Sequence, residues 1–173
     1  MCITKENVLY AFEKLENAKN NTTLPTWEQL PSIELYMDQV IILLNQYINP
    51  SAPITQSMIN NYVKLKVVPA PVKKRYGKIH LAYLIIFCTL KQTLSLSTIQ
   101  KIMPVDLSEE QVIEVYASFI ENRQKAIEYD FKKTKEFSKN DDTINIILQS
   151  SSIANVFKIL TEDIAFEKDE KKE

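Results

Sequence analysis

The stretch ITQSMINNYVKLKVVPAPVKKRYGKIHLAYL, residues 54–84, contains the clearest structural signals in the chain. Its first part predicts a helix over 55–65, because the threonine at position 55 is a favourable N-cap. Segment 67–72 holds two prolines and three valines, which exclude a helix and favour a short pair of strands with a turn. Gly77 then ends the excursion and precedes a second helix over 78–92. The order is therefore helix, short β ribbon, helix.

The same stretch lies in a block of the chain that has basic but no acidic residues. Between Gln39 and Val105 there is no aspartate or glutamate, whereas the whole protein has a net charge of -1. Residues 1–38 carry -3 and residues 106–173 carry -6, so solubility alone does not explain the +8 of this block. Its eight basic residues are Lys64, Lys66, Lys73, Lys74, Arg75, Lys78, Lys91 and Lys101. A compact basic surface is typical of a protein that binds a polyanion, most often nucleic acid.

Periodicity and capping residues predict that the rest of the chain is helical, which makes the fold class mainly α. A capping box at Ser108–Gln111 begins a long helix, Ser108–Phe137. Further helices are expected over 5–19, 33–48, 97–103 and from about 141 to 166. The expected organisation is an N-terminal helix at 1–23, a central domain at 24–104, a C-terminal helical region at 105–167 and a disordered charged tail at 168–173.

Two apolar rows run along the long helix, so one row can pack on its own domain and the other on a partner. One row recurs with a period close to 3.5 residues, as in a coiled coil. We therefore predict a homodimer in which this row pairs with a second chain while residues 142–166 pack beside it. The pairing row is Val112, Val115, Phe119, Asn122, Ala126 and Tyr129. The second row is Ile113, Tyr116, Ile120, Ile127 and Phe131.

Composition argues against several classes of protein. Gly77 is the only glycine, which argues against a phosphate-binding glycine loop. No apolar run approaches the roughly 20 residues of a membrane span, and charges near the N-terminus exclude a signal peptide, so we expect a cytoplasmic protein. Cys2 and Cys88 indicate free thiols, not a disulfide framework. With one histidine and no Ser–His–Asp set or metal-binding spacing, we expect neither an enzyme nor a cofactor or metal.

Several segments resemble a bacterial family catalogued as domain of unknown function number 1836. They are LPTWEQLPSIELYMDQV at 24–40, MINNYVK at 58–64 and PVKKRYGKIHLAYL at 71–84. The segment LSLSTIQKIM at 94–103 is similar to the one that follows the wing in MerR-like regulators. The family is regarded as a MerR-type helix-turn-helix group of transcriptional regulators. The resemblance implies a MerR-like winged helix-turn-helix with a two-stranded β wing.

Carried over by position, the resemblance implies that helix 55–65 reads the major groove of DNA and that segment 67–77 forms a wing on the phosphates. The helix contributes Thr55, Gln56, Ser57, Asn60, Asn61, Tyr62, Lys64 and Lys66. The wing contributes Lys73, Lys74, Arg75, Tyr76 and Lys78. The chain departs from the pattern at Lys66, where MerR-like helices often end in glycine.

We therefore expect a sequence-specific regulator that binds double-stranded DNA as a homodimer. The alternative is a helical adaptor that docks an acidic protein through the basic wing. Single-stranded nucleic acid fits less well, because only Tyr62 and Tyr76 are interleaved with the basic residues for base stacking. A small-molecule effector, if one acts, has room only between the long helix and the last one.

Overall fold

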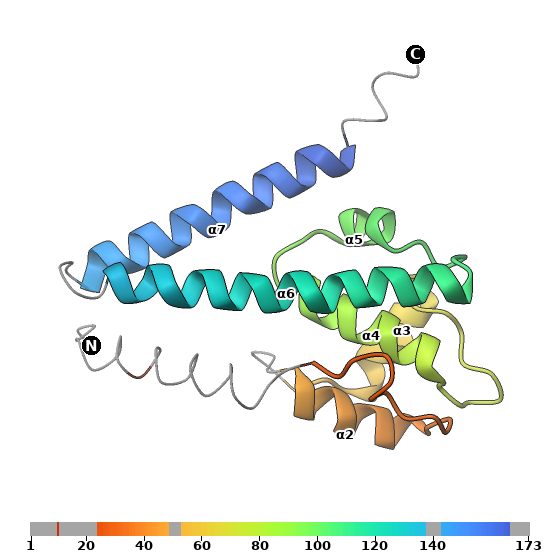
Figure 1. Ribbon diagram of the computed structural model, residues 1–173. Coiled ribbons are helices and arrows are strands. Elements are labelled where there is room, and N and C mark those ends of the chain that lie inside the picture. Colours follow the sequence, from red (N-terminus) through yellow and green to blue (C-terminus); the bar gives the residue numbers. More distant parts are fainter. Residues whose placement is uncertain (1–9, 11–23, 49–52, 138–142, 167–173) are drawn as a thin grey trace, which may run out of the picture.

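The computed structural model describes residues 10, 24–48, 53–137 and 143–166, and of residues 129–137 and 143 the backbone only. Its helices are α2 (Met37–Tyr47), α3 (Gln56–Lys64), α4 (Lys78–Leu90), α5 (Leu96–Ile102), α6 (Glu109–Phe137) and α7 (Thr143–Phe166). Figure 1 shows α6 spanning the molecule, with α2, α3 and α4 below it and α5 and α7 above. Within the described residues the β pairing consists of two isolated bridges, which confirms the mainly α fold class.

Helix α4 lies at the centre of the fold because its sequence is apolar on every side. Eight consecutive residues, Leu81–Cys88, are buried. A helix with this pattern must be surrounded by other elements, since any face left in water would expose apolar side chains. Helices α2 and α6 both pack against it.

Helix α6 begins where the sequence predicts and joins the core through its first half. The hydroxyl of Ser108 accepts the N–H of Gln111 at 3.3 Å, while the Gln111 side chain accepts the N–H of Ser108 at 2.9 Å. These two bonds are the expected capping box. Farther along, Tyr116 is fully buried, and its hydroxyl donates to the carbonyl of Pro25 at 2.7 Å. The Tyr116 ring meets Trp27 edge-on, which anchors the segment before α2 on the core.

The two-stranded wing expected over 67–77 is not formed. The two valines that begin this segment are buried in the core, and the two prolines that follow lack the N–H groups of a strand ladder. What remains is a tight turn in which Val72 and Arg75 exchange backbone hydrogen bonds at 3.2 and 2.9 Å. A second bridge joins Tyr76 to Leu35, with both bonds at 2.9 Å.

Helix α2 begins later than the sequence predicts. The periodicity indicates a helix over 33–48, yet the backbone of Leu35 is extended by its bridge, and the first helical residue is Met37. The side chain of Gln39 accepts the N–H of Tyr36 at 2.9 Å, which satisfies a donor at the start of the helix. A long-range backbone pair thus shortens the helix that the local pattern favours.

Other expectations concern the two ends of the chain. The helix predicted over 5–19 lies outside the described residues except for Tyr10, which is helical, and the tail at 168–173 also lies outside them. Helix α7 touches α5 and leaves most of its apolar side chains exposed. Among the helices described, none has the length and apolar character to cross a membrane.

Candidate nucleic-acid interface

Helix α3 presents a polar face to solvent. Thr55 caps the helix, its hydroxyl accepting the N–H of Met58 at 3.4 Å. Ile59 and Tyr62 turn into the core. The opposite side carries exposed residues at helical spacing, none of them acidic: Gln56, Ser57, Asn60, Asn61 and Lys64. Amide and hydroxyl groups can hydrogen-bond to base edges, and the major groove of DNA admits one α-helix.

The amide of Asn45 fixes the position of α3 relative to α2. Its Oδ1 accepts the N–H of Ile54 at 2.9 Å, and its Nδ2 donates to the carbonyl of Ile54 at 3.1 Å. The same Nδ2 donates to the carbonyl of Ile41 at 2.9 Å, within α2. Ile54 immediately precedes the Thr55 cap, so these bonds set where α3 begins. The sequence does not identify Asn45, because an asparagine in a helical pattern gives no sign of the distant backbone that it binds.

Helix α3 ends in a Schellman motif that has lysine at the position usually taken by glycine. The N–H of Lys66 donates to the carbonyl of Val63 at 3.0 Å, and that of Val67 donates to Tyr62 at 3.1 Å. This geometry needs a left-handed backbone, and Lys66 has a φ of 55°. Lys66 therefore adopts the conformation that a glycine favours.

The turn at 72–75 also contains lysines with a left-handed backbone. Lys73 and Lys74 lie between the bridged Val72 and Arg75, and both have positive φ, 50° and 65°. Two such residues between paired neighbours make a type I′ turn, which normally takes Asn-Gly. Among the described residues, the non-glycine positions with positive φ are thus three lysines of the basic block. Figure 1 shows the loop in yellow-green as an excursion between α3 and α4.

His80 closes this loop from the first turn of α4. Its Nδ1 lies 3.1 Å from the N–H of Gly77, and its Nε2 lies 3.1 Å from the carbonyl of Ala70. An N–H can only donate and a carbonyl can only accept, so the contacts fit the tautomer in which Nδ1 accepts and Nε2 donates. One side chain therefore ties together the two ends of segment 70–77. Sequence reasoning overlooks this role, since a lone histidine carries no signal for it.

The basic residues fall into two groups. Lys78 donates to the carbonyl of Trp27 at 3.0 Å, Lys91 donates to the hydroxyl of Tyr62, and Lys101 donates to a backbone carbonyl of α7. These three are engaged within the chain. In the part of the chain that the structure describes, no carboxylate forms an ion pair with the exposed cations Lys64, Lys66, Lys73, Lys74 and Arg75. The guanidinium of Arg75 instead lies 4.8 Å from the centroid of the Tyr36 ring.

A family described as Domain of unknown function (DUF1836) matches residues 25–119, which is more than half of the chain. The chain belongs to the DUF1836 family. No curated protein and no solved structure matches the sequence. The matched DUF1836 region contains α2 to α5 and ends within α6, so α7 lies outside it.

Two of the predicted contact residues lie in the core of the DUF1836 domain. Tyr62 is 7% exposed and packs on Phe87 with ring centroids 4.4 Å apart. Tyr76 is 2% exposed and meets the His80 ring edge-on, and burial raises the pKa of its phenol. Their rings are therefore covered and cannot stack on bases. Alternating apolar and basic residues do not reveal this, because a tyrosine suits either environment.

The row of α6 predicted for dimerisation is divided between core and surface. Its first half covers the DUF1836 core, where Val112 is fully buried and Val115 and Phe119 pack beside it. Val112 is therefore unavailable to a second chain, whereas Val115 and Phe119 are half-buried and keep part of their surface in solvent. Beyond them Asn122 and Ala126 are exposed, while the side chain of Tyr129 lies outside the described residues.

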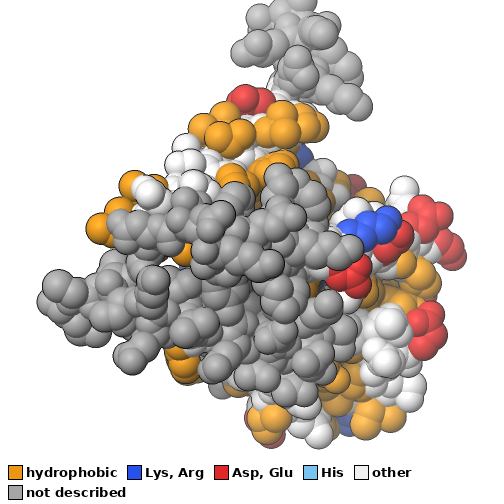
Figure 2. All heavy atoms as spheres, turned by 60° about the vertical axis from the view of Figure 1, so that its left-hand side comes forward, with side chains coloured by type: hydrophobic (Ala, Val, Ile, Leu, Met, Phe, Trp, Pro, Cys, Tyr) orange, Lys and Arg blue, Asp and Glu red, His pale blue; other side chains and the backbone are white. Residues whose placement is uncertain are grey.

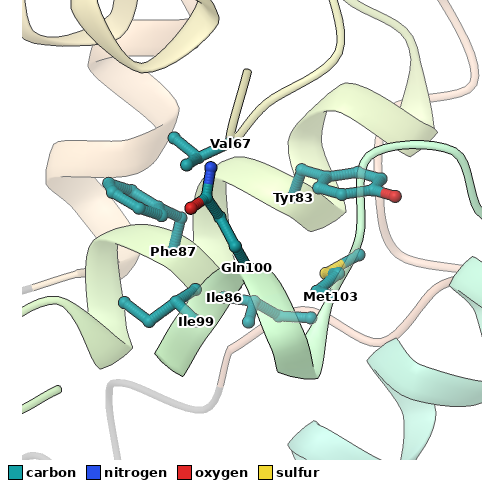
Figure 3. Close-up of a pocket in the computed structure, with 7 residues that line it drawn as sticks. All are labelled: Val67, Tyr83, Ile86, Phe87, Ile99, Gln100 and Met103. Atoms are coloured by element: carbon teal, nitrogen blue, oxygen red, sulfur yellow. The ribbon is translucent and has the colours of Figure 1, made fainter. Parts of the chain in front are cut away.

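A depression between α4 and α5 does not form a ligand cavity. Figure 3 shows apolar side chains from the two helices converging on it, with the amide of Gln100 among them. It has no room even for a water molecule. Its lining residues are Val67, Tyr83, Ile86, Phe87, Ile99, Gln100 and Met103. The depression is the seam along which α5 packs on the core.

Proposed function

We propose that this DUF1836 protein is a sequence-specific transcriptional regulator that binds double-stranded DNA as a homodimer. Helix α3 enters the major groove, and the basic turn at 72–75 contacts the phosphates beside it. The proposal is carried by one observation: an exposed helix face without acids ends in one exposed cation and is followed by four more, and no described carboxylate forms an ion pair with any of the five.

The roles of the two groups differ. Asn60 and Asn61 can hydrogen-bond to base edges, with a preference for adenine, and so supply sequence discrimination. Lys64, Lys73 and Lys74 attract phosphates of any sequence and so supply affinity. Tyr62 and Tyr76 are the two aromatic residues interleaved with the basic ones, and both lie in the core. The binding of single-stranded nucleic acid by base stacking on these two rings is therefore not supported.

The left-handed lysines support a binding role for the loop. A residue with a side chain costs roughly 1–2 kcal/mol in this conformation relative to glycine, so three of them are a substantial loss for one small region. Strained backbone persists where the surroundings enforce it, and it gathers at functional sites. At Lys66, Lys73 and Lys74 the positive charge takes the place of the residue that would stabilise the fold best.

The test uses a variant whose stability and binding change in opposite directions. Lys73→Asn with Lys74→Gly keeps the turn, because Asn-Gly is its favoured sequence, and removes two charges. We expect the free energy of unfolding to rise by about 1 kcal/mol. Binding to a random-sequence duplex is followed by fluorescence anisotropy from about 50 to 200 mM salt. The log–log salt slope should be shallower by about 1.8 per bound protomer, since each phosphate contact contributes about 0.9.

A matched control removes two exposed lysines from outside the basic block. Lys125→Ala with Lys158→Ala changes the net charge equally and should leave the salt slope unchanged. If the wild-type protein does not bind duplex at about 50 mM salt, the proposal is wrong. The basic turn would then be assigned to an acidic protein partner, and reversing the charges of Lys73, Lys74 and Arg75 should abolish that contact.

A further inference from the structure

Helix α7 leaves its apolar side chains in water. Ten of them are between 39% and 63% exposed. Figure 2 shows hydrophobic side chains gathered near the top of the molecule, where α7 lies in Figure 1. A helix that is apolar on several sides is normally buried, and soluble monomers rarely expose an apolar area of this extent. An apolar surface of this extent is typical of a site that another surface covers.

Five of these side chains form a single stripe: Ile153, Val156, Phe157, Leu160 and Ile164. Their spacing of three, one, three and four residues places them on one face of a helix. The contact with α5 lies elsewhere on α7, where Lys101 donates to the carbonyl of Ala165 at 3.2 Å and its ammonium lies 4.0 Å from the Phe166 ring centroid. That contact holds one end of the helix and leaves the stripe open.

The low charge of α7 and the area of its stripe indicate what kind of surface binds there. Within 143–166 the charged residues are Lys158, Glu162 and Asp163. A helix that lies on a membrane needs a basic polar face, and α7 has none. A strongly charged protein partner needs a surface of opposite charge, which α7 also lacks. At roughly 80–100 Å² each, the five side chains of the stripe expose on the order of 450 Å² per protomer. Two stripes that meet therefore bury about 900 Å² of apolar surface before the polar rim is counted, close to the roughly 1,000 Å² of a specific interface.

We propose that α7 is the pairing surface for a second copy of this chain. A two-fold axis brings the stripe of one protomer against the same stripe of its partner, so an uncharged apolar surface meets a surface of equal character. This differs from pairing along the row of α6 that begins at Val112, because Val112 itself is buried in the core. The helix lies outside the region matched by the DUF1836 family, and the proposal does not depend on nucleic acid binding.

Sedimentation velocity of the full chain at tens of micromolar tests the proposal without DNA. The wild-type protein should sediment with twice the 20.0 kDa mass of the chain. Phe157→Glu with Leu160→Glu should raise the dimer dissociation constant by about a hundredfold or more, because each substitution buries an unpaired carboxylate. Ile42→Glu is the control, a 68% exposed isoleucine on α2, and should leave the dimer intact. Circular dichroism checks that the three proteins have equal helix content.

A cross-linking experiment covers the case in which the double variant fails to fold. In a Cys2→Ser background, Leu160→Cys should form an interchain disulfide on mild oxidation, whereas Ile42→Cys should not. A monomeric wild-type protein, a dimer that survives the stripe substitutions, or equal cross-linking at both positions would overturn the proposal. A monomer that floats with vesicles of phosphatidylcholine and phosphatidylserine would overturn it in favour of a membrane surface. Loss of DNA binding in the Lys73→Asn, Lys74→Gly variant leaves the proposal untouched.

Discussion

Lys66 occupies a backbone conformation that is costly for any residue with a side chain. The Schellman motif at the end of α3 fixes this conformation through the hydrogen bonds of Lys66 and Val67. The side chain itself is exposed. Replacing Lys66 by glycine therefore removes a positive charge and relieves the backbone strain, and it leaves no cavity in the core.

We expect Lys66→Gly to raise the free energy of unfolding by roughly 0.5–1 kcal/mol. Glycine removes the left-handed penalty, and its greater freedom in the unfolded chain offsets part of the gain. The measurement is urea unfolding followed by circular dichroism. Lys64→Gly is the matched control, because Lys64 is helical, and it should lower stability by about 1 kcal/mol. Equal effects of the two glycines would contradict the role of the left-handed backbone.

At the level of the helices, the start of α3 is held to α2 by the side chain of Asn45, which the sequence pattern does not single out. Helix boundaries follow from local signals, and α3, α5 and α6 begin within a residue or two of the predicted positions because Thr55, Ser95 and Ser108 cap them. The relation between α2 and α3 does not follow from local signals, since Asn45 binds a backbone nine residues away.

Asn45→Ala should lower the free energy of unfolding by about 2 kcal/mol. The substitution leaves the N–H and carbonyl of Ile54 without partners in a partly buried place. Gln46→Ala, at an exposed position of the same helix, should change stability by less than about 0.5 kcal/mol. Thermal or urea unfolding compares the two. Equal stability of both variants would show that the Asn45 amide does not hold the two helices together.

In the molecule as a whole, the burial of α4 lowers the reactivity of the Cys88 thiol, which that helix carries. Cys88 is 1% exposed, and burial raises the pKa of its thiol from an ordinary value near 9 to about 12. A thiol that stays protonated and covered reacts only when the core opens. Because the native state holds this proton more tightly than the unfolded state, its contribution to stability is present below about pH 9 and lost as the pH rises toward 12.

In a Cys2→Ser variant we expect Cys88 to resist Ellman's reagent at pH 8. The rate should be many times slower than in urea and should not increase with reagent concentration once opening limits it. Stability measured by urea unfolding should fall between about pH 9 and pH 11, more steeply than in a Cys88→Ala variant. Immediate stoichiometric reaction of the folded protein would place Cys88 at the surface.

The mainly helical class, most helix positions, the family and the basic block can be predicted from the sequence, because periodicity, caps and charge counts are local properties. Which apolar faces are covered depends on contacts between distant segments and follows from the fold. The hydrophobic pattern shows which side chains share a face of α6, but both of its rows are apolar, and contact with α4 and Pro25 selects the half that becomes core. Likewise Tyr62 and Tyr76 suit surface or interior equally, and the segment predicted as a wing is a turn in which Val67 and Val68 are buried in the core while Val72 is exposed.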